Sequence, residues 1–331
     1  MTTILPSLTV VEEARIRESV GRPLALQAAE EAFRAMAEGR AVVPPPIGLE
    51  LPAARGEVHV KGAWMEGAPH FAIKVASGFY DNARHGLPTG SGLVLVFDAA
   101  TGFPRALLLD NGYLTDLRTG AAGALAVRLL APDRPLTVAV VGAGTQARFQ
   151  LRAMADVRTL REIRAWAPHP EGAAELCREL QEELGVPATG APDVAAAVRG
   201  ADLVVTVTPA RAPLVLDPWV EAHATVIAVG SDGPDKQELD PRLLARADKL
   251  IVDHLDQCAR LGELHHALAA GALTRDAVHG TLGGVLTGLV AGREAEELIV
   301  CDLTGVGVQD AAMARAAWSA LEYHRTSATE Y

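Results

Sequence analysis

A glycine-rich turn between an apolar strand and a helix constrains the fold of this chain more than any other feature. The run TVAVV leads into residues 142–147, GAGTQA, which open a helix reaching about Asp156. Gly142 permits a tight turn, Gly144 lets a diphosphate approach the backbone, and Ala147 is small enough for the helix to pack on a sheet. A tight turn with no ligand is the alternative, but the strand and helix on either side favour dinucleotide binding. We expect cofactor contacts from Gly142, Gly144, Thr145, Gln146 and Ala147.

The sequence after this turn alternates between strands and helices. Five short apolar runs are typical of buried strands, and helix-like stretches such as EGAAELCRELQEELG separate them; the runs are TVAVVGAG, EIRAWAP, ADLVVTVTP, ATVIAVG and KLIVDH. This alternation is typical of a doubly wound, mostly parallel sheet. We therefore predict the α/β class, with a Rossmann NAD(P)-binding domain at residues 119–304.

The remaining sequence predicts an α+β domain at residues 1–118. Residues 9–39 are expected to be helical, with Thr9 and Glu12 as a capping box and Gly39 as the stop. FAIKVASGF and SGLVLVFDAATGFPRALL have the pattern of successive strands, and residues 114–132 are expected to form one long helix. The tail, residues 305–331, has a glycine turn followed by a helix that we expect to pack back on this domain.

Composition narrows the class of partner. The chain has 331 residues, 49% of them apolar, and a formal charge of -11 without a dense basic run, which argues against nucleic acid and anionic membrane and favours a small molecule. No secretory signal or run of roughly 20 apolar residues is found, so we expect a cytoplasmic protein. The three cysteines are widely spaced and expected to be buried, and no histidine has metal-ligand spacing with nearby acids; we expect no metal.

The identity of the dinucleotide depends on the end of the strand EIRAWAP. An Asp or Glu there would hold the ribose 2′-OH, but Ala167, Pro168 and His169 stand in its place. Arg148 and Arg164 lie nearby in sequence and would tolerate a 2′-phosphate, so the residues favour NADP over NAD. Arg148 is equally compatible with a solvated helix charge.

Polar residues follow two of the predicted strands at their carboxyl ends, where ligands bind in open α/β sheets. Asp232 and Lys236 follow ATVIAVG, whose Gly230 would let a nicotinamide ring approach, while Thr206 and Thr208 follow the preceding apolar run. We expect Thr206, Thr208, Gly230 and His169 to contribute to the cofactor site. A turn cap is the alternative role for Asp232.

Two cations stand among apolar residues. Lys74 lies within FAIKVASGF and Arg118 within an alanine-rich helix, where a charge is costly without a partner. A guanidinium beside an ammonium is a good receptor for a carboxylate, and an acid opposite would relay protons. The set Lys74, Arg118 and Asp232 therefore predicts a cleft for an amino or keto acid. An internal ion pair for Arg118 and an edge-facing Lys74 are the alternatives.

Six stretches, taken in order, resemble the ornithine cyclodeaminase/mu-crystallin family: FAIKVASGFYDN, GLPTGSGLVLVFDAATGFP, LTDLRTGAAGA, VVGAGTQA, AVGSDGPDKQELD and GVGVQD. The resemblance covers residues from about 40 to 315. It implies that Lys74 and Arg118 hold the substrate carboxylate, that Asp232 is the acid/base, with Lys236 in the same loop, and that Thr115 contacts the cofactor. It also implies hydride transfer between the substrate Cα and nicotinamide C4, and a homodimer formed through the first domain.

One position departs from the cyclodeaminase pattern. Counting back from Lys74 without a gap, Lys61 stands where those enzymes carry an acid near the distal amine of the substrate. A cation there would repel the ammonium of ornithine and suit a second carboxylate. A solvent-facing Lys61 on an edge strand is the alternative. Arg55 corresponds only loosely to a further family arginine, as a second substrate contact.

Three functions follow from these observations. The first is an NAD(P)H-dependent imino acid reductase, equivalently an amino acid dehydrogenase, acting at Cα of a small and possibly dicarboxylic substrate. The second is a cyclodeaminase, which converts a diamino acid into a cyclic imino acid and ammonia while its cofactor is recycled. The third is a noncatalytic protein that binds NADPH or another ligand, against which the set Lys74, Arg118 and Asp232 counts.

Overall fold

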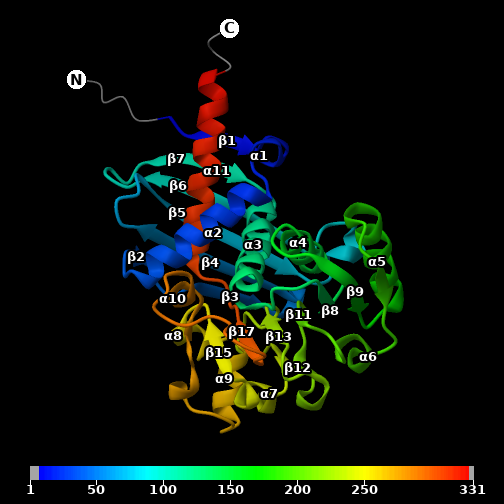
Figure 1. Ribbon diagram of the computed structural model, residues 1–331. Coiled ribbons are helices and arrows are strands. Elements are labelled where there is room, and N and C mark those ends of the chain that lie inside the picture. Colours follow the sequence, from blue (N-terminus) through cyan, green and yellow to red (C-terminus); the bar gives the residue numbers. More distant parts are fainter. Residues whose placement is uncertain (1–6, 328–331) are drawn as a thin grey trace, which may run out of the picture. The chain divides into compact units, whose positions relative to one another are not determined.

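The computed structural model describes residues 7–327, and the chain divides into two compact units (Figure 1). Unit 1 is Met1–Arg118 with Val306–Tyr331, and unit 2 is Thr119–Gly305. The boundary lies within helix α3 (Tyr113–Leu130), whose first residues therefore belong to unit 1 and whose remainder belongs to unit 2. The predicted fold class, a Rossmann domain with an α+β domain, is confirmed.

Unit 1 is built on one seven-stranded sheet of order β1-β7-β6-β5-β4-β2, with β3 paired to β4. Its pairs are antiparallel except for the parallel pair β1 and β7. The strands are β1 (Thr9–Glu12), β2 (Ala41–Val42), β3 (Ile47–Leu51), β4 (Gly56–Met65), β5 (His70–Phe79), β6 (Gly90–Asp98) and β7 (Pro104–Leu109). Strands β5 to β7 confirm the strands predicted from their alternating sequence.

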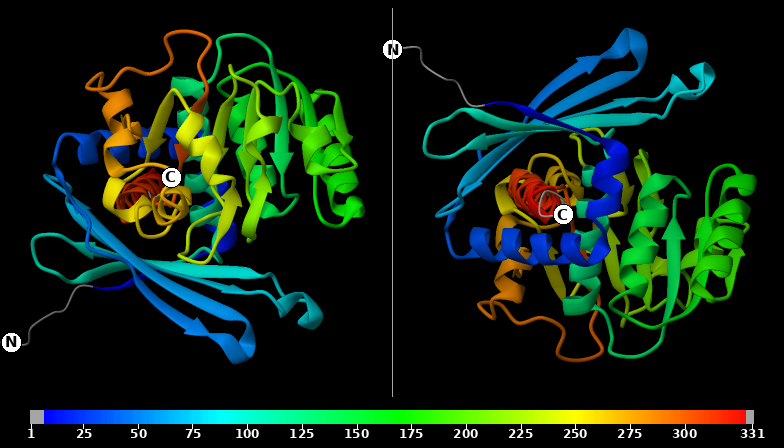
Figure 2. Two further views of the ribbon diagram at one scale, coloured as in Figure 1. Left: turned by 90° about the horizontal axis from the view of Figure 1, so that it is seen from below. Right: turned by 90° about the horizontal axis from the view of Figure 1, so that it is seen from above.

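Helices cover one face of this sheet. Helices α2 (Arg22–Ala37) and α11 (Gly307–Ser327) pack on each other, and α11 also contacts β4 and β5, as the two views of Figure 2 show. Short helical segments complete the unit: α1 (Glu13–Ser19), η1 (Pro52–Ala54) and η2 (Asn82–His85). The sheet residues under α11 are buried, whereas their neighbours on the opposite face are half-buried or exposed.

The prediction of one helix at residues 9–39 is wrong in two respects. Thr9 begins strand β1, because the β-branched run Thr9–Val11 pairs with β7, so Thr9 is no helix cap. The helical part is then broken at Gly21, whose backbone is extended and is followed by Pro23 near the start of α2. Gly39 has a positive φ of 70° just beyond α2, as expected for a helix stop.

Unit 2 is a doubly wound sheet of eight parallel strands in the order β10-β9-β8-β11-β13-β17-β15-β16. Every residue of its five central strands β8, β11, β13, β17 and β15 is buried, which requires cover on both faces. The strands are β8 (Leu136–Val141), β9 (Leu160–Trp166), β10 (Ala188–Gly190), β11 (Leu203–Thr206), β13 (Thr225–Ala228), β15 (Lys249–Val252), β16 (Gly280–Thr281) and β17 (Ile299–Asp302). The sequence predicted five of these; β17 was missed and inserts between β13 and β15.

Helices connect these strands and place the functional loops. The helices of unit 2, besides α3, are α4 (Thr145–Ala155), α5 (Pro170–Leu184), α6 (Val194–Val198), α7 (Pro241–Arg246), α8 (Leu255–Cys258), α9 (Glu263–Ala269) and α10 (Leu282–Leu286), with η3 (Asp217–Trp219) and η4 (Arg275–Ala277). A small two-stranded sheet pairs β12 (Arg211–Val215) with β14 (Gln237–Leu239). Strand order reverses between β8 and β11, which makes their carboxyl ends the expected ligand crevice.

No helix within residues 7–327 is both long and apolar enough to cross a membrane.

Candidate active site

Two lysines lie side by side on the helix-covered face of unit 1. Lys61 in β4 is the direct cross-strand partner of Lys74 in β5, and both point to the buried face because Ala63 and Ala72, two residues away, are buried with them. Lys61 is only 9% exposed and Lys74 only 3%. The alternatives of a solvent-facing Lys61 and an edge-facing Lys74 are therefore wrong.

The first turn of α11 brings a carboxylate to these lysines. Gly307 packs so closely on β4 that a Cβ there would lie 2.7 Å from the carbonyl oxygen of Gly62. Asp310, one turn later, accepts hydrogen bonds at Oδ1 from Lys74 Nζ and from Arg118 Nε, each at 2.9 Å. All three side chains are buried. Unit 1 therefore joins Lys74 to Arg118 through an aspartate that the sequence reasoning did not single out, and Arg118 has the internal ion pair that was the alternative for it.

Basic side chains outnumber the acidic ones in this cluster. Lys61, Lys74 and Arg118 lie around the carboxylate of Asp310, and Asp110 is a second carboxylate that interacts with the charge of Lys74. Burial lowers the pKa of Lys74 to about 7, opposed by the charge of Asp310 and reinforced by Arg118 and Lys61. Burial by itself raises the pKa of Asp310, but Arg118, Lys74 and Lys61 outweigh it and hold that pKa below its usual value. A second anion would therefore be stabilised here.

Arg55 does not join this cluster. It lies in the turn before β4 with a φ of 46°, its side chain is 64% exposed, and it donates a hydrogen bond to Asp81 at 2.9 Å. Lys61 follows six residues later along an extended strand, a rise of roughly 20 Å. The loose correspondence of Arg55 to a substrate-binding arginine gains no support from its position.

The glycine turn of unit 2 has the shape of a phosphate cradle. Gly142 has a φ of 115°, and a Cβ there would lie 3.0 Å from Val207 in the loop after β11, so this turn requires glycine. A Cβ at Gly144 would meet nothing within 4 Å, and Gly144 has an ordinary negative φ. The fold itself therefore does not need glycine at this position, whereas a diphosphate approaching the N-terminus of α4 would.

The side chains expected to recognise the ribose have other partners. Arg148 in α4 donates to Glu179 at 2.7 Å and to the carbonyl oxygen of Ala143 at 2.7 Å. Arg164 in β9 pairs with Glu162 and donates to the carbonyl oxygen of Arg199. His169 is an exposed residue before α5, with no side-chain hydrogen bond to that helix. The main reason for favouring NADP over NAD is therefore weakened.

The loop after β13 is fastened by Glu238, a residue that sequence reasoning passed over. Its carboxylate accepts hydrogen bonds from Thr206 Oγ1 at 2.7 Å, Thr208 N at 2.6 Å, Thr208 Oγ1 at 2.8 Å and Gly230 N at 2.8 Å. Burial raises the pKa of Glu238 to about 7, against the lowering effect of these donors. The hydroxyls of Thr206 and Thr208 are thus engaged inside the protein.

The same loop carries Asp232, whose side chain is partly exposed. Asp232 Oδ1 accepts a hydrogen bond from Lys236 Nζ at 2.7 Å, and the side chain of Asp232 is 44% exposed while that of Lys236 is 12% exposed. Ser231 Oγ donates to the carbonyl oxygen of Lys236, which also lies 2.8 Å from His266 Nε2. The loop therefore holds the partly exposed carboxylate of Asp232 in an ion pair at the carboxyl end of β13.

Signals for the two missed residues exist in the sequence. Asp310 is an acid in the first turn of a helix, where a carboxylate interacts favourably with the helix dipole, and an alanine-rich stretch follows it. Glu238 follows β13 by ten residues and lies within the short strand β14. Neither signal names a partner, because Asp310 lies 236 residues from Lys74 and Glu238 lies 32 residues from Thr206.

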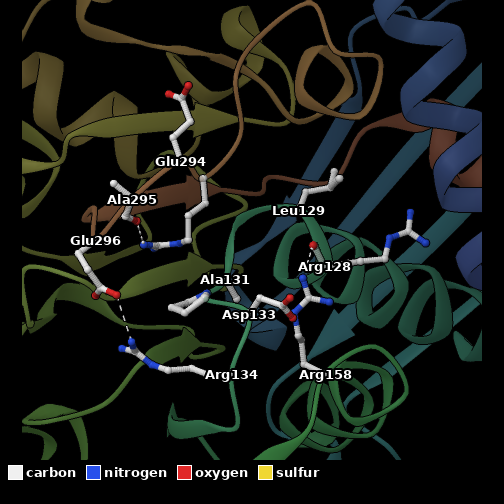
Figure 3. Close-up of a pocket in the computed structure, with 11 residues that line it drawn as sticks. Arg128, Leu129, Ala131, Asp133, Arg134, Arg158, Glu294, Ala295 and Glu296 are labelled. Atoms are coloured by element: carbon white, nitrogen blue, oxygen red, sulfur yellow. Dashed lines mark hydrogen bonds and ion pairs between the residues drawn. The ribbon is translucent and has the colours of Figure 1, made fainter.

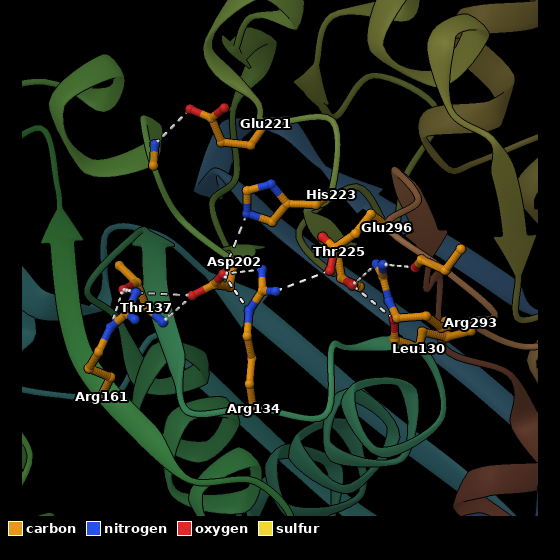
Figure 4. A network of polar contacts seen from close by, with 12 residues as sticks. Leu130, Arg134, Thr137, Arg161, Asp202, Glu221, His223, Thr225, Arg293 and Glu296 are labelled. Atoms are coloured by element: carbon orange, nitrogen blue, oxygen red, sulfur yellow. Dashed lines mark hydrogen bonds and ion pairs between the residues drawn. The ribbon is translucent and has the colours of Figure 1, made fainter.

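A second charged region lies at the opposite, amino ends of the unit 2 strands. Asp202 accepts hydrogen bonds from Arg134 at 2.9 Å, Arg161 at 3.3 Å and the backbone nitrogen of Thr137 at 2.8 Å, and His223 Nε2 lies 3.4 Å from it (Figure 4). Both carboxylate oxygens are used. This arrangement fixes the starts of β8 and β11.

Beside it is a pocket of about 400 Å³ at the end of α3 (Figure 3). Two of its arginines donate to terminal carbonyl oxygens of α3: Arg158 to Arg128 O and Arg293 to Leu130 O, each at 2.7 Å. These cations cap the negative end of the helix dipole, which accounts for their position without a ligand. Among residues 7–327, no group of three or more His, Cys, Asp or Glu side chains is placed to hold a metal ion.

Comparison with known proteins identifies the family. The model of the ornithine cyclodeaminase/mu-crystallin family matches residues 7–323. The chain belongs to this family. Family membership thereby confirms the resemblance drawn from the six sequence stretches.

Curated relatives of this family member include both enzyme types that we considered. It is 45% identical to an uncharacterised cyclodeaminase of Sinorhizobium fredii (96% of this chain, 97% of the relative). It is 37% identical to alanine dehydrogenase of Archaeoglobus fulgidus (92% of each chain) and 35% identical to iminosuccinate reductase of Paracoccus denitrificans (93% and 95%). These relatives confirm the expectation of an enzyme.

Solved structures of the family have the same fold over nearly the whole chain. An archaeal alanine dehydrogenase dimer with bound NAD superposes with a TM-score of 0.90, 34% identity and coverage of 96% of this chain and 97% of the other. The Δ1-pyrroline-2-carboxylate reductase of Thermococcus litoralis, in complex with NADH and L-proline, superposes with a TM-score of 0.91 and is 26% identical. This match covers 96% of this chain and 98% of the other.

Proposed function

We propose that this protein is an NAD(P)H-dependent imino acid reductase, equivalently an amino acid dehydrogenase, that acts at Cα of a small amino acid. The observation that carries the proposal is the cluster of unit 1, in which Lys61, Lys74 and Arg118 are buried around one carboxylate, Asp310. Such an excess of buried cations favours a substrate that brings a carboxylate of its own. The curated relatives named as reductases or dehydrogenases support the same reaction class.

Each of the principal residues has a role in this reaction. Arg118 and Lys74 bind the substrate carboxylate and orient Cα, and Asp232, in unit 2, gives a proton to the imine nitrogen or takes one from the amine. A bound reduced nicotinamide would supply the hydride that Cα accepts. The imine carbon thus gains a hydride and the nitrogen a proton, which yields the amine.

The cofactor is proposed to lie on the glycine turn at Gly142 and Gly144, with NAD preferred over NADP. The space beside Gly144 supports a diphosphate there. The arginines that would read a 2′-phosphate, Arg148 and Arg164, are both paired with glutamates. NAD or NADH is also the cofactor bound in the two structural relatives described above. Thr115, Thr145, Gln146, Ala147, Thr206, Thr208, Gly230 and His169 remain proposed contacts.

The substrate side chain is proposed to be small, and Lys61 makes a second carboxylate acceptable. Lys61 lies directly opposite Lys74 and adds a third positive charge to the cluster. A diamino acid such as ornithine would place an ammonium near these cations, at a cost in binding. This observation favours the reductase over the cyclodeaminase, which stays the second candidate because of the relative named as a cyclodeaminase.

The test is a pair of assays on the purified protein. NADH or NADPH oxidation is followed at 340 nm with pyruvate or oxaloacetate plus ammonia or methylamine, and ammonia release is measured from ornithine, lysine and diaminobutyrate. Oxidation of the cofactor with a 2-oxo acid and an amine is expected. Ammonia release from a diamino acid, with no net change in nicotinamide absorbance, would replace the reductase by the cyclodeaminase.

The role of Asp232 has a test of its own. Asp232→Asn removes the proton donor but keeps the size of the side chain, so turnover is expected to fall by roughly 10²- to 10⁴-fold. Cofactor affinity is expected to change little, because Asp232 is proposed to act on the substrate nitrogen. An equal loss of turnover and NADH affinity would remove this assignment.

We also propose that the protein is a homodimer formed through the uncovered face of the unit 1 sheet. On this face Val10, Leu107, Leu95 and Ile73 form one cross-strand row of half-buried or exposed apolar side chains. Ile47, Val60, Val75 and Leu93 form a second. An apolar patch of this kind marks an interaction site. Light scattering is expected to give twice the 34.7 kDa chain mass, and Ile73→Glu to reduce it to one chain.

A further inference from the structure

Asp310 occupies a position in the proposed active site that requires an explanation. It is a fully buried carboxylate on α11, reached by two cations that the proposed reaction needs for the substrate. Lys74 and Arg118 both use the same oxygen, Oδ1, and Oδ2 is buried without a hydrogen-bond partner among the described residues. An internal ion pair alone would be better served by both oxygens.

We propose that Asp310 is a positioning residue: it holds Lys74 and Arg118 side by side as a receptor for one substrate carboxylate, and its charge favours the protonated form of Lys74. This inference rests on the proposed function and adds a residue to it. Asp310 does not touch reacting atoms in this account. It acts through the two side chains that do.

The geometry supports the positioning role. Lys74 is on β5, Arg118 on α3 and Asp310 on α11, so three elements distant in the sequence meet at one oxygen. Both contacts are 2.9 Å, which is short enough for charge-assisted hydrogen bonds. Without Asp310, two cations in this space would repel each other, and neither would have a fixed direction.

The charges around Lys74 support the protonation role. Lys61 faces it from β4 and Arg118 from α3, and both cations disfavour its charged form; Asp310 on α11 favours it. Asp110, in the residues before α3, is a further carboxylate that senses the charge of Lys74. With these neighbours and burial, the pKa of Lys74 is about 7. Removing the charge of Asp310 must lower this pKa further, so more Lys74 would be neutral at pH 7.

The experiment compares Asp310→Asn and Asp310→Glu with the matched control Asp202→Asn. Asp202 is also a buried carboxylate reached by two arginines, but it lies in the structural cluster of unit 2. In the wild type, kcat/KM should fall as pH rises through the pKa of Lys74. In Asp310→Asn, this limb should move to lower pH by about one unit, and kcat/KM at pH 7 should drop by roughly 100-fold.

The other measurements separate positioning from general damage. The KM for the 2-oxo acid should rise in Asp310→Asn while the KM for NADH stays the same, and Asp310→Glu should restore the position of the pH limb. Asp202→Asn should leave the limb and both KM values unchanged although its melting temperature falls. The proposal would be overturned if the decline of kcat/KM with rising pH occurred at the same pH in Asp310→Asn as in the wild type. An equal shift of that decline in Asp202→Asn would also overturn it.

A binding measurement keeps this test independent of turnover. Malonate is titrated calorimetrically at pH 7 in two buffers of different ionisation enthalpy, which gives the protons taken up on binding. With a Lys74 pKa of about 7, the wild type should take up about half a proton, and Asp202→Asn the same. Asp310→Asn should take up nearly one, or lose malonate binding while Asp310→Glu retains it. If wild-type protein binds malonate in this way but reduces no imine, the reductase proposal fails and the role of Asp310 stands. Equal uptake in wild type and Asp310→Asn would contradict that role.

Discussion

Two buried aspartates in this molecule gather cations, and they do so in different ways. Asp202 uses both oxygens, and its arginines extend to solvent, with side chains 40% exposed for Arg134 and 58% for Arg161 (Figure 4). Asp310 uses one oxygen, and its partners Lys74 and Arg118 are buried. The charge at Asp202 is therefore balanced by groups that water also solvates, whereas the charge at Asp310 leaves buried cations in excess.

The difference teaches which property marks a binding site. The number of cations around a carboxylate is similar in the two clusters, so it does not separate them. Solvent screens the charges of the exposed arginines at Asp202, so these arginines would gain little from binding a further anion. Cations held away from solvent at Asp310 gain far more from a further anion.

The largest effect is expected from removing a buried cation. Lys74→Ala should reduce kcat/KM by about 10²- to 10³-fold, because truncating one partner of a buried charge pair costs about 3 to 4 kcal/mol. Arg161→Ala, its counterpart at Asp202, should leave kcat/KM unchanged. Steady-state kinetics of the two purified variants measure this. A comparable loss in both would show that the two clusters do not differ in function.

A smaller loss, in stability alone, is expected at the other cluster. Asp202→Asn weakens the charged hydrogen bonds to Arg134 and Arg161 and alters that to Thr137 N, so the free energy of unfolding should fall by about 2 kcal/mol. Its kcat and KM should match those of the wild type well below the melting temperature. Urea unfolding and kinetics on the same preparation give both quantities. Reduced kcat in folded protein would contradict a purely structural Asp202.

The next effect concerns the third cation. Lys61→Met keeps the length and apolar stem of the side chain but removes its charge. With oxaloacetate and an amine, kcat/KM should fall by roughly tenfold, and with pyruvate by less than about threefold, because only a dicarboxylate gains from the additional cation. The ratio of the two specificity constants is the measurement. If kcat/KM falls equally for both substrates, Lys61 stabilises the cluster but does not recognise the side chain of the substrate.

The smallest effect is a pH dependence of the wild-type enzyme. Lysine carries its charge below its pKa, so the receptor is fully charged well below pH 7 and loses the charge of Lys74 as pH rises through about 7. The kcat/KM for the 2-oxo acid should therefore decline by roughly fivefold from pH 7 to pH 8. Asp202→Asn should follow the same curve. A flat profile from pH 6 to pH 9 would contradict the titration of Lys74.

Much of the fold, and some residues of the candidate site, could be predicted from the sequence. Strong local patterns predicted the alternating strands of unit 2, the glycine turn at residues 142–147 and the long helix α3. The pattern failed at residues 9–12, where pairing with β7 outweighs a plausible capping box. Strand β17 was missed because its short apolar run precedes a glycine turn with no helix signal between.

Candidate site residues could be singled out from the sequence where the chemistry is unusual at a single position. A lysine inside an apolar strand and an arginine inside an alanine-rich helix are visible in one sequence, and Lys74 and Arg118 do meet. Asp310 and Glu238 were not singled out from the sequence, because an acid near the start of a helix or strand is common. Only the fold brings its hydrogen-bond partners close to it. The partner of Arg148 could not be predicted for the same reason, since Glu179 lies 31 residues away on α5.

The most direct test is a crystal structure of the protein with NAD and malonate. The account predicts a malonate carboxylate within about 3 Å of both Lys74 Nζ and the Arg118 guanidinium, with Asp310 still in place, and no anion at the arginines of Asp202. Malonate bound elsewhere, with Lys74 and Arg118 in contact with Asp310 alone, would contradict it.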